Sequence, residues 1–217
     1  IAPFQGTQPA QSYPEIILYS ADLTALLALL EKQAKPQLVD WFVNKIRSLH
    51  LAGAEFAVIA SNTPHMVFEE IQARSPIPLL SIVEATLKKV LSLGLKRPGL
   101  LGTGFTMKSD YYQKVFRRQG LEIAVPDAVD QQLIHQRLFT EIELGIIKES
   151  TRQELLEVIR RMKEKSAIDS VILGCTELPL ILTRDGLGLP FLNTAAIHVE
   201  SILRYSLGSD SFGEGAI

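Results

Sequence analysis

The sequence predicts an α/β fold with mainly parallel sheets. Short runs of apolar and β-branched residues alternate with longer amphipathic segments along all 217 residues, which is the chain order of parallel strands joined by helices. The runs at 56–60 and 171–173 are apolar without alternation, as expected when helices cover both faces of a sheet. We therefore expect a buried parallel sheet flanked by helices.

The strands are expected wherever four to six apolar or β-branched residues stand between turn residues: 15–19, 55–60, 78–82, 99–102, 122–125, 170–174 and 190–193. The helices are expected in the longer segments with helical periodicity between them: 36–51, 64–74, 83–93, 108–119, 128–147, 151–165 and 195–205. Gly53, Gly94 and Gly120 follow three of these helices, where a glycine commonly ends a helix.

The composition excludes several classes of function. Hydrophobic residues make up 47% and charged residues 21% of the chain, which is typical of a soluble globular protein and excludes disorder. Opposed charges (22 Lys+Arg, 24 Asp+Glu) leave a net charge of −2, so we expect no nucleic-acid partner. The longest apolar run, 23–30, stops at Glu31 and Lys32, so we expect no membrane span and, equally, no secretory signal. The single cysteine excludes an internal disulfide and paired-cysteine zinc motifs, so we expect a reduced, cytoplasmic location.

A repeat in the chain predicts two similar lobes. Residues 56–64 resemble residues 170–179, and residues 77–81 resemble residues 189–193, in the same order. We expect a first α/β lobe over 1–96, completed by 195–217, and a second α/β lobe over 97–194. Because open α/β sheets bind ligands at the carboxyl ends of their strands, Ser61 and Cys175 are expected to face each other across the cleft between the lobes.

Cys175 is the leading catalytic candidate. It follows an apolar strand and precedes Thr176, Glu177 and a short helix-like segment, whose backbone amides are expected to lower the thiol pKa. The alternative is a small buried side chain, as most free cysteines are. The sequence leaves both interpretations open.

Two further segments have the residue types of a small-anion site. Ser61, Asn62 and Thr63 follow the strand at 55–60, with Pro64 at a plausible first helical position, and the same residues serve equally well as a helix cap. The loop 102–106 offers the hydroxyls and amides that hold a carboxylate, but it lacks the spacing of a nucleotide-binding loop.

The histidines predict no metal site. The four histidines, His50, His65, His135 and His198, are scattered without metal-ligand spacing. In addition, no serine stands in a Gly-x-Ser-x-Gly elbow, which argues against an α/β-hydrolase. His65 lies close to the Ser61 turn and is interpreted either as a ligand contact or, more commonly for such a residue, as a structural one.

Taken together, four segments resemble the aspartate/glutamate racemase family. They follow the family's order and, with their surroundings, span the chain from about residue 15 to 203: EFAVIASNTPH at 55–65, IPLLSIVEAT at 77–86, GLLGT at 99–103 with Thr106, and GCTEL at 174–178. The resemblance implies a two-lobed fold, no pyridoxal phosphate, no metal or other cofactor, and a homodimer. It also implies a reaction in which one group removes the α-proton of an amino acid and another returns a proton on the opposite face.

The resemblance assigns roles to particular residues. Cys175 is one acid/base, and Ser61 occupies the position of the other. Neutral polar residues would hold the α-carboxylate and ammonium, namely Asn62, Thr63, Thr103, Thr106 and Thr176. Pro64 and Glu177 complete the predicted substrate-binding set.

Three features depart from the family pattern. Ser61 replaces the usual cysteine, and a serine hydroxyl is a much poorer base than a thiolate, so activity is expected to favour one enantiomer. The chain starts at Ile1, where the family has a strand and a Gly-Gly-Met-Gly-Pro-like turn, so we expect both to be missing from this sequence. Aspartate-specific members carry basic residues for the distal carboxylate, but residues 20–22 and Glu143 fall at those places here.

These departures keep two alternatives open beside an amino-acid racemase. One is a catalytically impaired protein that binds an amino acid or a small carboxylate. The other is a decarboxylase of malonate-like acids that uses Cys175 alone, because protonating a carbanion from one face needs one acid. The preferred side chain is left open.

Overall fold

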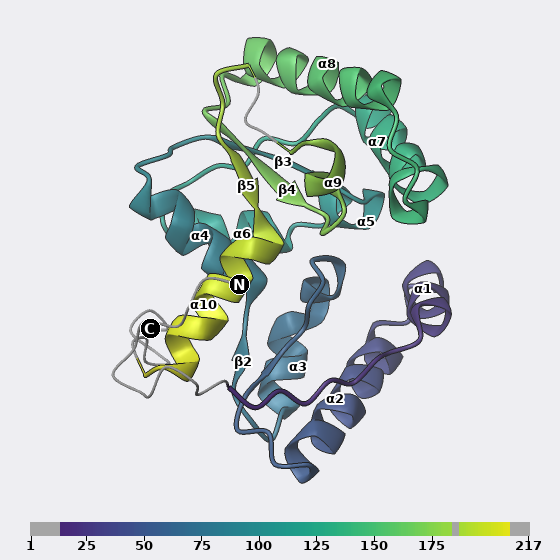
Figure 1. Cartoon of the computed structure of the whole chain (residues 1–217), viewed down its shortest axis with the longest axis vertical. Helices are drawn as coiled ribbons and strands as arrows, with labels where there is room; N and C mark the ends of the chain where they lie inside the picture. Colours follow the sequence, from purple (N-terminus) through teal and green to yellow (C-terminus); the bar gives the residue numbers. More distant parts are fainter. Residues whose placement is uncertain (1–13, 184–186, 209–217) are drawn as a thin grey trace. The chain divides into compact units, whose positions relative to one another are not determined.

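The computed structural model describes residues 14–183 and 187–208 (Figure 1). In chain order the elements are α1 (Leu23–Glu31), α2 (Lys35–Leu51), β1 (Ala57–Val58), η1 (Thr63–Val67), α3 (Phe68–Arg74), β2 (Leu79–Leu80), α4 (Ile82–Ser92), β3 (Pro98–Gly102), α5 (Gly104–Lys108), α6 (Tyr111–Arg117), α7 (Ala128–Thr140), η2 (Ile142–Leu144), α8 (Glu149–Ser166), β4 (Ser170–Gly174), α9 (Leu178–Ile181), β5 (Phe191–Asn193) and α10 (Thr194–Ser206). The alternation of strands and helices confirms the predicted α/β class.

The chain divides into two compact units. Among the described residues, the first unit contains 14–57, 69–79 and 199–208, and the second contains 58–68, 80–183 and 187–198. These boundaries differ from the predicted lobes, because 58–68 and 80–96 belong to the same unit as the predicted second lobe. The division into two similar lobes, 1–96 with 195–217 and 97–194, stays a prediction.

The second unit is built on a three-stranded parallel sheet in the order β3-β4-β5. β3 and β4 pair along their whole length, from Pro98 opposite Ser170 to Gly102 opposite Gly174. The shorter β5 continues the sheet, with Asn193 opposite Leu173. All three strands therefore end at the same edge, which is where parallel sheets place their ligand sites.

Helices cover both faces of this sheet, as the continuous apolar runs predict (Figure 1). Alternate residues of each strand point to opposite faces. Leu101, Val171 and Leu173 pack against buried side chains of α7 and α8, whereas Leu100 and Ile172 pack against those of α4 and α6. The strand side chains of both sets are almost wholly buried, so the sheet is the centre of two hydrophobic cores.

In the first unit, α2 has one buried face, which contains Leu38, Phe42 and Val43 among others. Pro36 stands in its first turn, where a missing backbone N–H costs nothing. α1 was not predicted as a helix, although Asp22 caps it by accepting a hydrogen bond from the backbone N–H of Thr24. None of the described helices is both long and apolar enough to cross a membrane.

The predicted strand at 15–19 is wrong. These residues form no regular element, and Ile16 and Leu18 are 82% and 85% exposed. No strand of the described residues pairs with the segment, and a strand without a partner leaves its backbone groups without the ladder that stabilises it. The predicted strand at 122–125 is reduced to one parallel bridge, between Ala124 and Gly99.

Two predicted helices are interrupted. The predicted helix 108–119 is interrupted at Ser109, whose extended backbone separates α5 from α6. The segment 128–147 ends as an α-helix at Thr140, because Glu141 leaves helical geometry before the short turn η2. Gly145 then takes a left-handed conformation (φ 75°) that closes this turn.

Two glycines allow the carboxyl ends of β3 and β4 to approach each other. A Cβ atom on Gly174 would lie 2.8 Å from the carbonyl oxygen of Leu101, and one on Gly102 would lie 2.9 Å from the carbonyl oxygen of Gly174. Backbone atoms cannot move aside as a flexible side chain can. These two positions therefore require glycine.

We predict that Gly174→Ala lowers the free energy of unfolding by about 1–3 kcal/mol, because the added methyl group forces the strands apart. Urea unfolding followed by circular dichroism measures the change. Gly104→Ala is the matched control, since its Cβ would meet no atom nearer than 3.4 Å. Equal stability of Gly174→Ala and the unmodified chain would contradict the steric argument.

Candidate active site

The candidate site is formed where the strands of the second unit end. Thr103 follows β3, Cys175 follows β4 and Thr194 follows β5. Because Gly102 is opposite Gly174 in the sheet, Thr103 and Cys175 come from neighbouring strand ends. Ser61 belongs to the same unit, in the segment 58–68.

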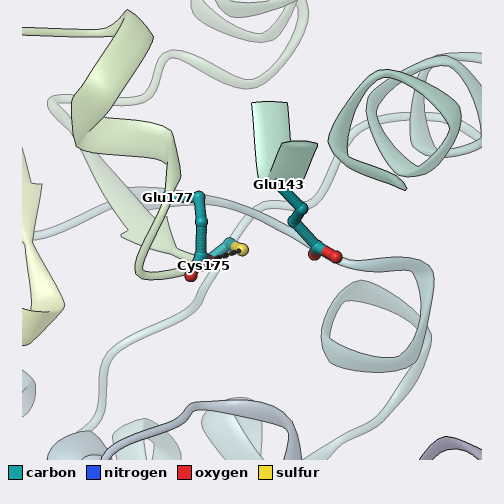
Figure 2. A group of neighbouring side chains, drawn as sticks. All are labelled: Glu143, Cys175 and Glu177. Atoms are coloured by element: carbon teal, nitrogen blue, oxygen red, sulfur yellow. Dashed lines mark hydrogen bonds between the residues drawn. The ribbon is translucent and has the colours of Figure 1, made fainter. Parts of the chain in front are cut away.

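Cys175 is buried, with 6% of its surface exposed, and its thiol has a defined partner. The Sγ–H group donates a hydrogen bond of 2.9 Å to Oε2 of Glu177 (Figure 2). The hydroxyl of Thr176 donates one of 2.8 Å to the same oxygen. Burial raises the pKa of the Cys175 thiol well above its usual range, and the carboxylates of Glu177 and Glu143 raise it further.

This result corrects the expected effect of the backbone on Cys175. The backbone N–H of Glu177 does lower the thiol pKa, as the sequence predicts, but burial and the carboxylate of Glu177 have larger effects in the opposite direction. The structure therefore favours the protonated thiol of Cys175 over the thiolate.

Glu143, on η2, is the third acidic group of this cluster. Its side chain lies beside those of Cys175 and Glu177 (Figure 2), and one ligand atom from each of the three residues lies within 4.8 Å of the others. Burial raises the pKa of Glu143, and the nearby Glu177 raises it as well. The three side chains have donor atoms close enough to share a metal ion, which the spacing of the histidines did not indicate.

Three threonine hydroxyls form a compact donor group. Oγ1 of Thr63 lies 3.2 Å from Oγ1 of Thr103 and 3.2 Å from Oγ1 of Thr106, and the last two are 3.3 Å apart. The hydroxyl of Tyr111 donates a fourth bond, of 3.3 Å, to Thr106. Three mutually bonded hydroxyls can turn their protons toward a bound carboxylate, since each rotates freely about its C–O bond.

The hydroxyl group lies beside the end of β4. A Cβ atom on Gly174, next to Cys175, would be 3.5 Å from the methyl carbon of Thr106. Burial raises the pKa of Tyr111, and the neighbouring Tyr112 and Cys175 raise it further, which places Tyr111 near the thiol. The structure thus brings the predicted residues Thr63, Thr103 and Thr106 together near Cys175.

Asn62 is buried, and its side-chain amide is hydrogen-bonded to neighbouring side chains. Its Nδ2 donates a hydrogen bond of 3.1 Å to Oγ1 of Thr194, and its Oδ1 accepts one of 2.7 Å from Tyr112. Thr194 in turn donates a bond of 2.8 Å to the carbonyl oxygen of Leu173, in β4. This chain of bonds connects the Ser61 turn to the strand that carries Cys175.

His65 holds the backbone of the Ser61 turn. Its Nδ1 lies 2.9 Å from the carbonyl oxygen of Ser61, and its Nε2 accepts a hydrogen bond of 3.2 Å from the backbone N–H of Ile82. The second bond requires an unprotonated Nε2, so Nδ1 carries the proton and donates it to Ser61. His65 is also stacked on Phe68 and buried, which supports the structural interpretation of this residue.

The other predicted residues form few side-chain hydrogen bonds within the described part of the chain. Pro64 is buried in the first turn of η1, Thr176 is half-buried beside Glu177, and Ser61 is half-buried with no side-chain hydrogen bond within the described residues. His135 accepts a hydrogen bond of 3.2 Å from the backbone N–H of Gly104, so this amide of the loop 102–106 is not available to bind a carboxylate.

Three residues of the site were missed as side-chain partners: Thr194, Tyr111 and Tyr112. Thr194 had a signal, because it follows its strand as Cys175 follows β4. The tyrosines had none, since their positions depend on how helices pack against the sheet. Glu143 was noted where the family carries a basic residue, but its proximity to the thiol was not predicted.

Comparison with known proteins gives a consistent result. The family profile described as Asp/Glu/Hydantoin racemase matches residues 4–202. A broad specificity amino-acid racemase from Bacillus subtilis is 29% identical over 201 residues, which cover 92% of this chain and 85% of the relative. A glutamate racemase from Aquifex aeolicus is 32% identical over 136 residues, but these cover 59% of this chain and 48% of the relative.

Solved structures are similar over most of the chain. A putative Asp/Glu racemase from Yersinia pestis has a TM-score of 0.81 and 32% identity, covering 91% of this chain and 86% of its own. An aspartate racemase homologue from Pyrococcus horikoshii has a TM-score of 0.76 and 32% identity, covering 94% and 88% respectively.

His65 generates a prediction about pH. Burial lowers its pKa from 6.5 to about 3, so the folded protein does not protonate it where the unfolded chain does. The free energy of unfolding is therefore unaffected by His65 above pH 6.5 and falls below it, by up to about 1.4 kcal/mol for each pH unit.

We predict that His65→Gln, which keeps a donor and an acceptor but does not titrate, makes the decline of stability with acidification shallower by about that slope. Urea unfolding at a series of pH values from 7.5 to about 5 measures it. Other buried groups contribute equally to both proteins, so the difference isolates His65. Parallel pH profiles would contradict the assignment.

Proposed function

The chain belongs to the Asp/Glu/hydantoin racemase family, and we propose that it is a cofactor-independent amino-acid racemase that uses Cys175 and Ser61 on opposite faces of the α-carbon. As a racemase it is an isomerase. The observation that carries the proposal is the buried thiol of Cys175 at a strand end, hydrogen-bonded to Glu177 and next to the hydroxyls of Thr103 and Thr106.

The substrate's α-carboxylate is held by the hydroxyls of Thr63, Thr103 and Thr106. These are neutral donors in a partly buried site, so they also stabilise the negative charge that grows on the carboxylate when the α-proton leaves. Asn62 and Pro64 keep the Ser61 turn in place, and Thr176 orients the carboxylate of Glu177. In this proposal Asn62, Pro64, Thr176 and Glu177 support the substrate site rather than provide most of its contacts.

In one direction Cys175 acts as the acid. A base on the Ser61 side removes the α-proton, the C–H electron pair stays on carbon, and the Cys175 thiol donates its proton to the opposite face. The product has inverted configuration and the sulfur is left as a thiolate. The base on the Ser61 side then releases the proton that it took to solvent, and Glu177 relays a proton from solvent to the thiolate. One proton has left the site and one has entered it, so both groups are restored.

In the other direction Cys175 acts as the base. Its raised pKa means that the thiol must first lose its proton, and Glu177 lies 2.9 Å away to accept it. The thiolate then takes the α-proton, and the Ser61 side returns one. Because Ser61 replaces the cysteine expected at its position, this side is the weaker acid/base, and the two enantiomers are processed at different rates.

The two alternatives from the sequence are less favoured. The relatives and solved neighbours reported above are described as racemases, which favours neither a silent binder nor a decarboxylase. A homodimer and a cytoplasmic location stay proposals. The first rests on the family resemblance, and the second on the single free cysteine.

We predict that Cys175→Ala lowers α-proton exchange by roughly 10²–10⁴-fold, the usual effect of removing a positioned acid/base. Loss of the α-proton signal of alanine, lysine, aspartate and glutamate, as both L and D forms in heavy water, is followed by proton NMR. Circular dichroism checks that the variant is folded. Exchange that survives unchanged in the folded variant would reject Cys175 as an acid/base.

We further predict that Ser61→Cys accelerates racemisation and makes the rates from the two enantiomers more nearly equal, because a thiolate is a stronger base near neutral pH than a serine hydroxyl. The same NMR experiment measures both rates. Ser61→Ala serves as the control that removes the hydroxyl without adding a thiol. If all three proteins exchange at one rate, residue 61 does not face the reacting carbon.

A further inference from the structure

We propose that Glu143 determines substrate specificity by excluding amino acids with acidic side chains and favouring those with neutral or basic ones. The inference rests on the proposed racemase function and concerns the same site. It starts from a half-buried carboxylate that the proposed chemistry does not otherwise use.

Two glutamates of the same turn differ in their surroundings. Glu141 is buried and receives hydrogen bonds from Arg137 (2.9 Å), Lys148 (3.0 Å) and the hydroxyl of Thr151, which together lower its pKa. Glu143 has neither an ion pair nor a hydrogen bond among the described residues, and its pKa is raised. Arg137 and Lys148 thus neutralise Glu141 and hold the turn in place, and the charge of Glu143 is not neutralised by either of them.

The position of Glu143 makes this charge relevant to the substrate. Its carboxylate lies in the group of atoms within 4.8 Å of one another that includes the sulfur of Cys175 and the carboxylate of Glu177 (Figure 2). A substrate must bring its α-carbon into contact with that sulfur to exchange a proton. The substrate's side chain starts at the α-carbon, so it then lies close to the carboxylates of Glu143 and Glu177.

Charge decides which side chains are accepted there. With the α-carboxylate on the threonine hydroxyls, a second carboxylate close to Glu143 and Glu177 is repelled in a partly buried site, where repulsion is stronger than in water. An ammonium group is attracted, and an alkyl group is neither attracted nor repelled. The charges that act on Glu143 and Cys175 in the described structure include no lysine or arginine that would reverse this preference.

The experiment compares four L-amino acids by α-proton exchange in heavy water, with protein treated with EDTA so that no metal ion occupies the same side chains. We expect lysine and alanine to exchange with higher kcat/KM than aspartate and glutamate, lysine by at least about tenfold. Glu143→Gln, which has nearly the same shape, is expected to reduce the lysine-to-glutamate ratio of kcat/KM at least about fivefold. The ratio is the readout because losing this carboxylate also changes the pKa of the Cys175 thiol, and that change acts on all four substrates alike. Most of the change should appear in KM.

Glu149→Gln is the matched control, because it removes the same charge from a side chain that is 69% exposed at the start of α8. It should leave the ratio unchanged. Faster exchange of aspartate or glutamate than of lysine in the unmodified protein overturns the inference while leaving the racemase proposal intact. An unchanged ratio in folded Glu143→Gln also overturns it. Absence of exchange with all four amino acids rejects the racemase proposal and, with it, the inference.

Discussion

The in-register parallel pairing of β3 with β4 is the constraint on which the candidate site depends. It ends both strands at the same level, with Gly102 opposite Gly174, and the absence of a Cβ at either residue lets the backbones approach. Thr103 and Cys175 consequently leave the sheet at neighbouring points. A side chain at either glycine would separate the hydroxyl donors from the thiol, so the chemistry of the site depends on two residues that have no functional group.

A second set of interactions attaches the Ser61 turn to this frame. Asn62 reaches β4 through Thr194 and Leu173, and His65 joins the carbonyl of Ser61 to the first amide of α4. Both side chains are buried and use polar atoms that would otherwise be costly to leave without partners. Within the segment that resembles a catalytic motif, Asn62 and His65 therefore hold the backbone in place, and Thr63 belongs to the group of three hydroxyls.

The electrostatics of the site arise from unequal neutralisation. Arg137 and Lys148 are paired with Glu141, whereas Glu143 and Glu177 lie beside the Cys175 thiol and form no ion pair within the described part of the chain. Their carboxylates raise the pKa of the thiol and make the region around its sulfur negative. In the mechanism that we propose, the same charges act on proton transfer and on the choice of substrate.

The sequence by itself determined the α/β class and the strands β3, β4 and β5 nearly to the residue, because these follow from local hydrophobic patterns. It also predicted Thr63, Thr103, Thr106 and Cys175 as site residues. It failed for residues 15–19, which have strand composition but no partner strand, and for the segment 128–147, where Glu141 and Gly145 redirect the chain. Three features were decided only by the tertiary structure: the Asn62 amide is hydrogen-bonded to Thr194 and Tyr112, the pKa of Cys175 is raised, and Glu143 lies close to the thiol. The burial of Cys175, the hydrogen-bond partners of Asn62 and the approach of Glu143 depend on residues distant in the chain, and no local pattern records them.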